Sequence, residues 1–134
     1  MASRIGVRPP LCDYDPGVAL TVLIVDDHET FRGCARACFE AEGLDVVGEA
    51  VDGASAVAVA DELEPDVILL DVQLPDIDGF EVAERLQARG FGGRIVLTSS
   101  RDGEDFGPLV ARCGARGFVP KAELSRATLA PLLE

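Results

Sequence analysis

Five short apolar segments recur along this sequence, and each is followed by a stretch in which apolar residues repeat at helical spacing. The first segment, LTVLIV at residues 20–25, is rich in β-branched residues and shows no polar alternation, which is typical of a strand buried on both faces of a parallel sheet. The same reasoning predicts strands at 20–25, 44–49, 67–70, 95–97 and 118–119, with helices at 29–42, 54–63, about 80–86, 104–112 and 124–133. Five such alternations predict right-handed βαβ crossovers and a single α/β domain, doubly wound around a central five-stranded parallel sheet.

The first 19 residues lack this rhythm. They contain Pro9-Pro10 and Pro16-Gly17 among scattered charges, and they have no periodic pattern. We therefore expect residues 1–19 to form a flexible tail, followed by one domain over residues 20–134. A chain of 134 residues is long enough for one ordinary domain and too short for two.

Charge excludes several classes of function. The chain has 24 acidic against 12 basic residues, a formal net charge of −12. Such a surface repels phosphates and anionic lipids, so we expect no direct binding of nucleic acid and no membrane association by this chain. The sequence contains no run near the roughly 18 apolar residues that cross a bilayer, and charged residues and prolines interrupt the place where a signal peptide would have its apolar core. A cytoplasmic protein is the expectation.

The cysteines give no metal or disulfide pattern, because none of Cys12, Cys34, Cys38 and Cys113 forms a CxxC pair. Cys34 and Cys38 stand four residues apart, which places them on one face of the predicted helix. We interpret both as small buried packing residues, with a redox or metal role as the alternative.

Polar residues that a purely structural loop would not need stand at the ends of the predicted strands. Asp26 and Asp27 follow the first strand, Asp71 follows the third, and Thr98 ends the fourth. Lys121, the only lysine, lies just past the fifth strand. Because the carboxyl ends of parallel strands share one edge of the sheet, where ligands bind in such folds, we expect these five side chains to converge.

Three crowded carboxylates repel one another, and each is pushed toward protonation. A divalent cation relieves this repulsion, and a set of oxygen ligands suits Mg²⁺. With a hydroxyl and an ammonium group nearby, the arrangement favours phosphoryl transfer onto a carboxylate, which forms an acyl phosphate. Taken singly, the residues have ordinary explanations: an Asp pair caps a helix, Thr98 is a β-former, and Lys121 is a solvated charge. Their joint occurrence at the strand ends favours the functional interpretation.

Four local strings carry a family resemblance: VLIVDDHETFR at 22–32, DVILLDVQLPDIDGFE at 66–81, RIVLTSS at 94–100 and GFVPK at 117–121. With these strings in this order, the chain from about residue 20 to 133 resembles the receiver domain of bacterial two-component response regulators. The resemblance implies a flavodoxin-like strand order, 2-1-3-4-5. It also implies that Asp71 accepts a phosphoryl group from the phosphohistidine of a histidine kinase.

Further roles follow from the resemblance residue by residue. Asp26, Asp27, Asp71 and the backbone carbonyl of Gln73 would hold Mg²⁺, with Mn²⁺ as a substitute. Thr98 would be the switch hydroxyl, Phe118 the switch aromatic and Lys121 the phosphate-binding lysine. The implied partners are a sensor histidine kinase or a phosphotransfer protein, and a phosphorylation-dependent homodimer through the fourth helix, fifth strand and fifth helix.

The residues around the lysine depart from the commonest pattern of the family. Pro120 precedes Lys121 and Ala122 follows it, which is similar to receivers attached to helix-turn-helix DNA-binding domains of the LuxR/NarL type. We expect no output domain within residues 20–134. Two interpretations stay open: a stand-alone receiver, or a receiver cut from a longer regulator that would control transcription.

Three other functions compete. A haloacid-dehalogenase-like phosphatase needs a second Asp two residues after the nucleophile, where this chain has Gln73, so we expect no turnover of an external substrate. A flavodoxin-like cofactor binder needs a phosphate-cradling loop after the first strand, and the acidic residues 26–29 would repel phosphate there. A degenerate receiver that acts by protein contact alone is the third alternative, and the complete set of site residues argues against it.

Overall fold

A computed structural model of the chain describes residues 20–100 and 107–133. The predicted tail at 1–19 and the first residues of the predicted helix at 104–112 lie outside these ranges. Strands and helices alternate along the described chain. They are β1 (Thr21–Val25), α1 (Glu29–Ala41), β2 (Asp45–Ala50), α2 (Gly53–Leu63), β3 (Val67–Asp71), α3 (Gly79–Ala88), β4 (Arg94–Ser99), α4 (Gly107–Arg112), β5 (Gly117–Pro120), the 3-10 turn η2 (Lys121–Glu123) and α5 (Arg126–Leu133).

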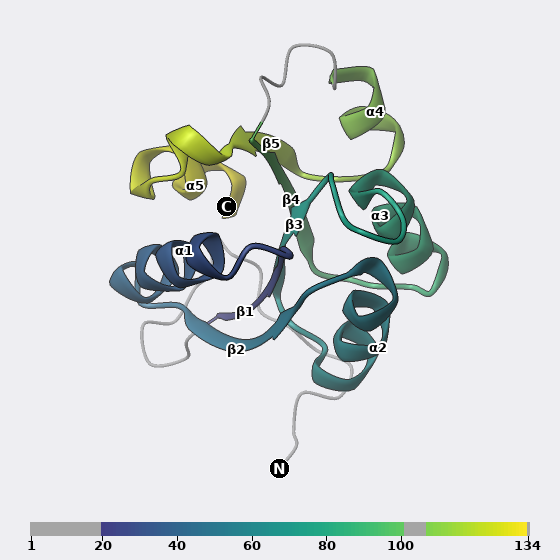
Figure 1. Cartoon of the computed structure of the whole chain (residues 1–134), viewed down its shortest axis with the longest axis horizontal. Coiled ribbons are helices and arrows are strands. Elements are labelled where there is room, and N and C mark those ends of the chain that lie inside the picture. Colours follow the sequence, from purple (N-terminus) through teal and green to yellow (C-terminus); the bar gives the residue numbers. More distant parts are fainter. Residues whose placement is uncertain (1–19, 101–106, 134) are drawn as a thin grey trace.

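The strands form one parallel sheet in the order β2-β1-β3-β4-β5. In Figure 1, α1 and α5 lie on one side of this sheet, and α2, α3 and α4 lie on the other. The doubly wound α/β fold and the flavodoxin-like strand order are therefore confirmed.

Both faces of the sheet are buried, as the unbroken apolar strands predict. Along β1, Leu23 and Val25 pack into the cluster that α2 and α3 cover, whereas Val22 and Ile24 pack into the cluster beneath α1 and α5. All four side chains are fully buried. Successive residues of a strand point to opposite faces, so a strand between two helical layers must be apolar at every position.

Two local expectations are wrong. The last helix begins at Arg126 rather than at Leu124, because η2 intervenes and Leu124 lies between the two elements. Cys34 is exposed, which contradicts its predicted packing role, whereas Cys38 is partly buried and packs against the cluster beneath α1 and α5. The buried residues of α1 are Ala35 and Phe39, and Cys34 points away from the face that they define.

Within residues 20–100 and 107–133, no helix has the length and apolar character that a membrane crossing requires.

Candidate functional site

The candidate site lies at the carboxyl edge of the sheet, where β1, β3 and β4 end side by side. Asp26 directly follows β1, Asp71 is the last residue of β3, and Thr98 lies opposite Asp71 in the register of β4. The order of strands reverses between β1 and β3, and in open parallel sheets the crevice at such a reversal is where ligands bind.

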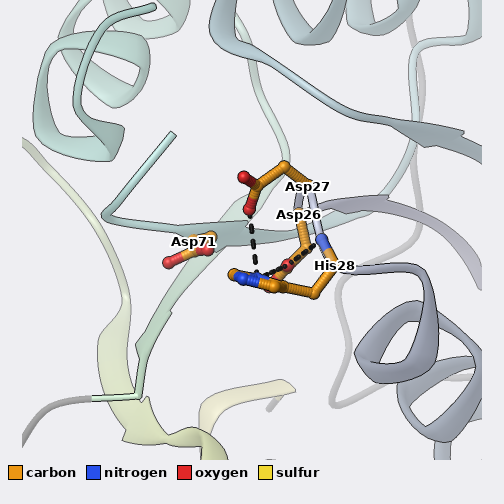
Figure 2. Close-up of side chains that lie close together, drawn as sticks. All are labelled: Asp26, Asp27, His28 and Asp71. Atoms are coloured by element: carbon orange, nitrogen blue, oxygen red, sulfur yellow. Dashed lines mark hydrogen bonds and ion pairs between the residues drawn. The ribbon is translucent and has the colours of Figure 1, made fainter. Parts of the chain in front are cut away.

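Four side chains gather there. Each of Asp26, Asp27, His28 and Asp71 offers a ligand atom, and these atoms all lie within 4.8 Å of one another (Figure 2). Asp26 and Asp71 are buried, whereas Asp27 and His28 are exposed. The structure thus brings together the three predicted carboxylates and adds His28, which the sequence did not assign to the site.

Lys121 reaches this cluster from the end of β5. Its ammonium nitrogen lies 2.6 Å from Asp26 Oδ2 and 3.3 Å from Asp71 Oδ2. The same nitrogen stands 4.6 Å from the centre of the Phe31 ring, a cation–π arrangement, and only 13% of its side chain is exposed. The single lysine of the chain is therefore held against the two buried carboxylates.

Opposing influences act on Asp71. Burial raises the pKa of its carboxyl, and the neighbouring charge of Asp26 raises it further. The backbone N–H of Gln73, which donates to Asp71 Oδ1 at 3.0 Å, and the Lys121 ammonium lower that pKa, but they do not reverse the net rise. A carboxylate in this position is poorly solvated, and a cation nearby would stabilise its ionised form.

Asp26 is fixed by its backbone, and its carboxylate faces the cluster, with Oδ1 toward His28 and Oδ2 toward Lys121. The Asp26 N–H donates to the Ala50 carbonyl oxygen at 3.0 Å, and Arg32 Nη1 donates to the Asp26 carbonyl oxygen at 2.7 Å. Among the described residues, the fully buried Asp26 Oδ2 accepts no hydrogen bond and has only its ion pair with Lys121. A buried oxygen of this kind, beside two more carboxylates, fits a hard divalent cation such as Mg²⁺.

The predicted switch residues lie one strand further on. Thr98 is fully buried, and its hydroxyl donates to the Val119 carbonyl oxygen of β5 at 2.6 Å. Phe118 is partly buried and packs against the core cluster that α2 and α3 cover. Thr98 is thus adjacent to Asp71 through strand pairing, while its hydroxyl bonds to β5.

The loop from β3 to α3 carries Gln73, and it is fastened at both ends. The Gly79 N–H donates to the Val72 carbonyl oxygen at 2.9 Å, and a Cβ on Gly79 would collide with the Asp71 carbonyl oxygen. In the middle of the loop, the carboxylate of Asp76 accepts from the backbone N–H groups of Gly53 and Ala54 at 2.8 and 3.0 Å. These bonds tie the loop to the N-terminus of α2.

Sequence reasoning placed His28 near the strand ends without giving it a role, and it missed Asp76. Asp76 lies in a loop with no periodic pattern, and its only signal was a carboxylate within the string LPDIDG. For His28 the signal was its place directly after two aspartates.

A sequence profile described as "Response regulator receiver domain" matches residues 22–132 of this chain. A protein of Pseudomonas aeruginosa that is named as a transcriptional regulator is 42% identical over 102 residues, which cover 76% of this chain and 49% of that protein. The chain therefore spans about half the length of the curated relatives it matches.

Solved structures agree with this similarity. The signal receiver domain of NarL from Mycobacterium tuberculosis is 34% identical, with a TM-score of 0.75 over 85% of this chain and 96% of that one. A chain in the CheX–CheY–BeF₃–Mg²⁺ complex from Borrelia burgdorferi is 26% identical, with a TM-score of 0.79 over 87% of each chain. The similarity to NarL agrees with the helix-turn-helix style of receiver indicated by Pro120.

Proposed function

This chain belongs to the family of response regulator receiver domains of two-component systems, and from that premise we propose that it is a phosphoacceptor whose acceptor group is Asp71. The proposal depends chiefly on one observation: the buried Asp71 carboxylate lies between the Gln73 N–H and the Lys121 ammonium, within 4.8 Å of ligand atoms from two other aspartates. Receiver domains are generally not metabolic enzymes, and we propose no turnover of an external substrate.

In the proposed reaction, a carboxylate oxygen of Asp71 attacks the phosphorus of a phosphohistidine. A P–O bond forms while the P–N bond breaks, and the bonding pair remains on the donor imidazole, which takes up a proton. The product is an acyl phosphate on Asp71. Lys121 contributes a positive charge that offsets the negative charge of the incoming phosphoryl oxygens.

The proposed cofactor is Mg²⁺, with Mn²⁺ as a substitute, held by Asp26, Asp27, Asp71 and the backbone carbonyl of Gln73. Bound there, the ion would neutralise charge on the phosphoryl oxygens as the group is transferred. Two observations support this assignment: the donor atoms are oxygens, and Asp26 Oδ2 is buried without a hydrogen bond among the described residues. The similar Borrelia burgdorferi complex is named with Mg²⁺ and with BeF₃, a mimic of a phosphoryl group.

We further propose that the acyl phosphate acts through Thr98 and Phe118. The Thr98 hydroxyl would leave the Val119 carbonyl oxygen and donate to a phosphoryl oxygen, and the Phe118 ring would move into the space vacated beside it. A charge change of about two units at Asp71 then biases an equilibrium between two packings of β4 and β5.

The proposed phosphodonor is a sensor histidine kinase or a phosphotransfer protein, and the proposed location is the cytoplasm. The proposed output surface comprises α4, β5 and α5, through which the phosphorylated chain would form a homodimer. The Pseudomonas aeruginosa relative is named as a transcriptional regulator, so we propose that this receiver serves transcriptional control within a longer regulator.

Mass spectrometry after incubation with acetyl phosphate and Mg²⁺ tests the central proposal. The wild-type chain should gain the mass of one phosphoryl group, and Asp71→Ala should gain none. A matched control is Asp61→Ala, because Asp61 is an exposed carboxylate of α2 that pairs with Arg89 outside the cluster. This control should be phosphorylated like the wild type. An unchanged wild-type mass, or equal labelling of Asp71→Ala, would overturn the assignment and favour a receiver that acts by contact alone.

A further inference from the structure

The imidazole of His28 turns toward the acidic cluster although its side chain is 66% exposed. Its Nδ1 atom lies 3.1 Å from Asp26 Oδ1 and 3.1 Å from Asp27 Oδ1 (Figure 2). The backbone N–H of His28 also donates to Asp26 Oδ1 at 2.8 Å, which fixes the residue at the start of α1. A histidine with that much solvent around it has room to face away, so its position between two carboxylates needs a reason.

Hydrogen bonding accounts for only part of this arrangement. Nδ1 carries at most one proton, so it can donate well to only one of the two carboxylates at a time. Asp26 Oδ1 already accepts the backbone N–H of His28. The lone pair of a neutral imidazole, in contrast, suits a cation held by Asp26, Asp27 and Asp71 at once, because all four ligand atoms lie within 4.8 Å of one another. Metal–ligand bonds of about 2.0 to 2.2 Å would hold these atoms within about 4.4 Å of one another, so binding one ion would draw the cluster slightly closer than its present 4.8 Å span.

We propose that His28 Nδ1 is a nitrogen ligand to the cation of this site, and that it shifts the preference of the site from Mg²⁺ toward first-row divalent ions such as Mn²⁺ and Zn²⁺. This inference rests on the proposed function, since the cation is the one that would serve phosphoryl transfer to Asp71. Mg²⁺ favours oxygen ligands and retains water, whereas imidazole is a good ligand for the later first-row ions. Adding one neutral nitrogen ligand to three carboxylates therefore changes which metal ion the site prefers, while the total charge of the ligands stays the same.

Mn²⁺ provides a stringent probe, because it has the weakest affinity for nitrogen ligands among these ions. Pulsed electron paramagnetic resonance of Mn²⁺ bound to the tag-free chain should show coupling to an imidazole ¹⁴N nucleus. His28 is the only histidine of the sequence, so such a coupling can come from no other residue. The coupling should disappear in His28→Gln and change to the ¹⁵N pattern when the chain is labelled with ¹⁵N-histidine.

Affinity gives a second measurement. His28→Gln should weaken Mn²⁺ binding about 10-fold and leave Mg²⁺ binding within about 2-fold, so that the ratio of the two affinities falls. The substitution changes an exposed side chain at the start of a helix, and Asp61→Asn serves as a surface control that should alter neither affinity.

The outcomes separate this inference from the proposed function. Mn²⁺ that binds in an Asp71-dependent manner without a ¹⁴N coupling would overturn the role of His28 and leave the phosphoacceptor intact. Equal losses of Mn²⁺ and Mg²⁺ affinity in His28→Gln would likewise overturn the selectivity. Failure of both ions to bind, or binding that Asp71→Ala does not weaken, would overturn the cation site of the proposed function together with this inference.

Discussion

At the scale of single residues, Asp71 has to remain ionised where burial opposes its charge. Its side chain is almost fully buried, and its pKa is raised first by loss of solvent and then by the charge of Asp26. A carboxyl group whose pKa is higher in the folded than in the unfolded state binds more protons when folded. The ordinary pKa of an Asp carboxyl is near 3.8. As the pH rises from that value through the raised pKa of Asp71, ionisation of Asp71 lowers the free energy of unfolding. At neutral pH the charge of Asp71 therefore lowers the free energy of unfolding.

Asp71→Asn, measured without divalent cations, should consequently raise the free energy of unfolding at pH 7, by a gain on the order of 1 kcal/mol. The gain should shrink as the pH falls toward 4, because the wild-type carboxyl then becomes neutral as well. Urea unfolding followed by circular dichroism across this pH range measures the effect.

Asp61→Asn is the control of opposite sign. The Arg89 guanidinium holds the pKa of the Asp61 carboxyl below its ordinary value. The negative charge of Asp61 therefore stabilises the folded chain above pH 3.8, and this stabilisation is lost as the pH falls through the lowered pKa. Replacing Asp61 should lower stability slightly at pH 7. A gain in Asp71→Asn that is equal at every pH would show that the charge of Asp71 is not its cause.

The sequence predicts chemistry at single positions better than it predicts exposure. Asp26 and Asp71 follow apolar strands, and strand ends determine their place, so their convergence could be inferred. The spacing of Cys34 and Cys38 fixed their position relative to each other, but it could not show which face of α1 meets the sheet. Ala35 and Phe39 define that face, and Cys34 lies outside it. The His28 ring faces the carboxylates of Asp26 and Asp27, its two neighbours in sequence, but their order along the chain does not show in which direction the ring turns.

At the scale of elements, the loop between β3 and α3 is held by a helix to which it is not joined. Asp76 accepts hydrogen bonds from the first two N–H groups of α2, and these bonds lower the pKa of its carboxyl. Ile77 packs so closely on Gly53 that a Cβ at Gly53 would collide with it. The loop that carries Gln73 is therefore positioned by the N-terminus of α2.

We predict that Asp76→Ala weakens Mg²⁺ binding about 3- to 10-fold, because the backbone of Gln73 is then held less firmly beside Asp71. It should also lower the melting temperature by a few degrees, since two N–H groups of α2 lose their acceptor. Isothermal titration with Mg²⁺ and thermal unfolding provide the two measurements.

Asp52→Ala is the matched control for this prediction. Asp52 is the N-cap of α2, and its carboxylate accepts from the Ser55 N–H at 2.8 Å, within the first turn of the helix itself. Its replacement should lower the melting temperature similarly and leave Mg²⁺ affinity unchanged. If both variants lose Mg²⁺ affinity to the same degree, the effect comes from α2 as a whole and not from the loop.

Element types followed from the sequence because the central strands β1, β3 and β4 are largely apolar on both faces and helices such as α1 and α3 carry an apolar stripe. The ends of the helices and strands were harder to predict from the sequence. The η2 turn separates Leu124 from α5, and the apolar spacing of the last segment gave no sign of that interruption. The hydrogen-bond partner of the Thr98 hydroxyl could not be predicted from the sequence either. The carbonyl oxygen of Val119 lies beside that hydroxyl only because of the register between β4 and β5.

At the scale of the whole molecule, helices cover both faces of the sheet, and the acidic cluster lies at its carboxyl edge (Figure 1). The rule that ligands bind where strand order reverses predicts this edge from the sequence alone. The chain as a whole carries a net charge of −12, so general salt screening and the proposed specific cation binding would both reduce its internal repulsion. An experiment on the cation has to separate these two effects.

Mg²⁺ should stabilise the folded chain beyond what screening provides. A ligand that binds only the folded state raises the free energy of unfolding by about 2.7 kcal/mol when its free concentration is 100 times its dissociation constant. Thermal unfolding in MgCl₂, compared with NaCl at equal ionic strength, should show this increment in the wild type and in Asp61→Asn. Asp27→Ala should lose most of it, because Asp27 contributes one of the clustered carboxylates while remaining partly exposed, so its removal spares the core. Equal stabilisation by NaCl, or an undiminished increment in Asp27→Ala, would mean that the cation acts on the overall charge and not at the carboxyl edge.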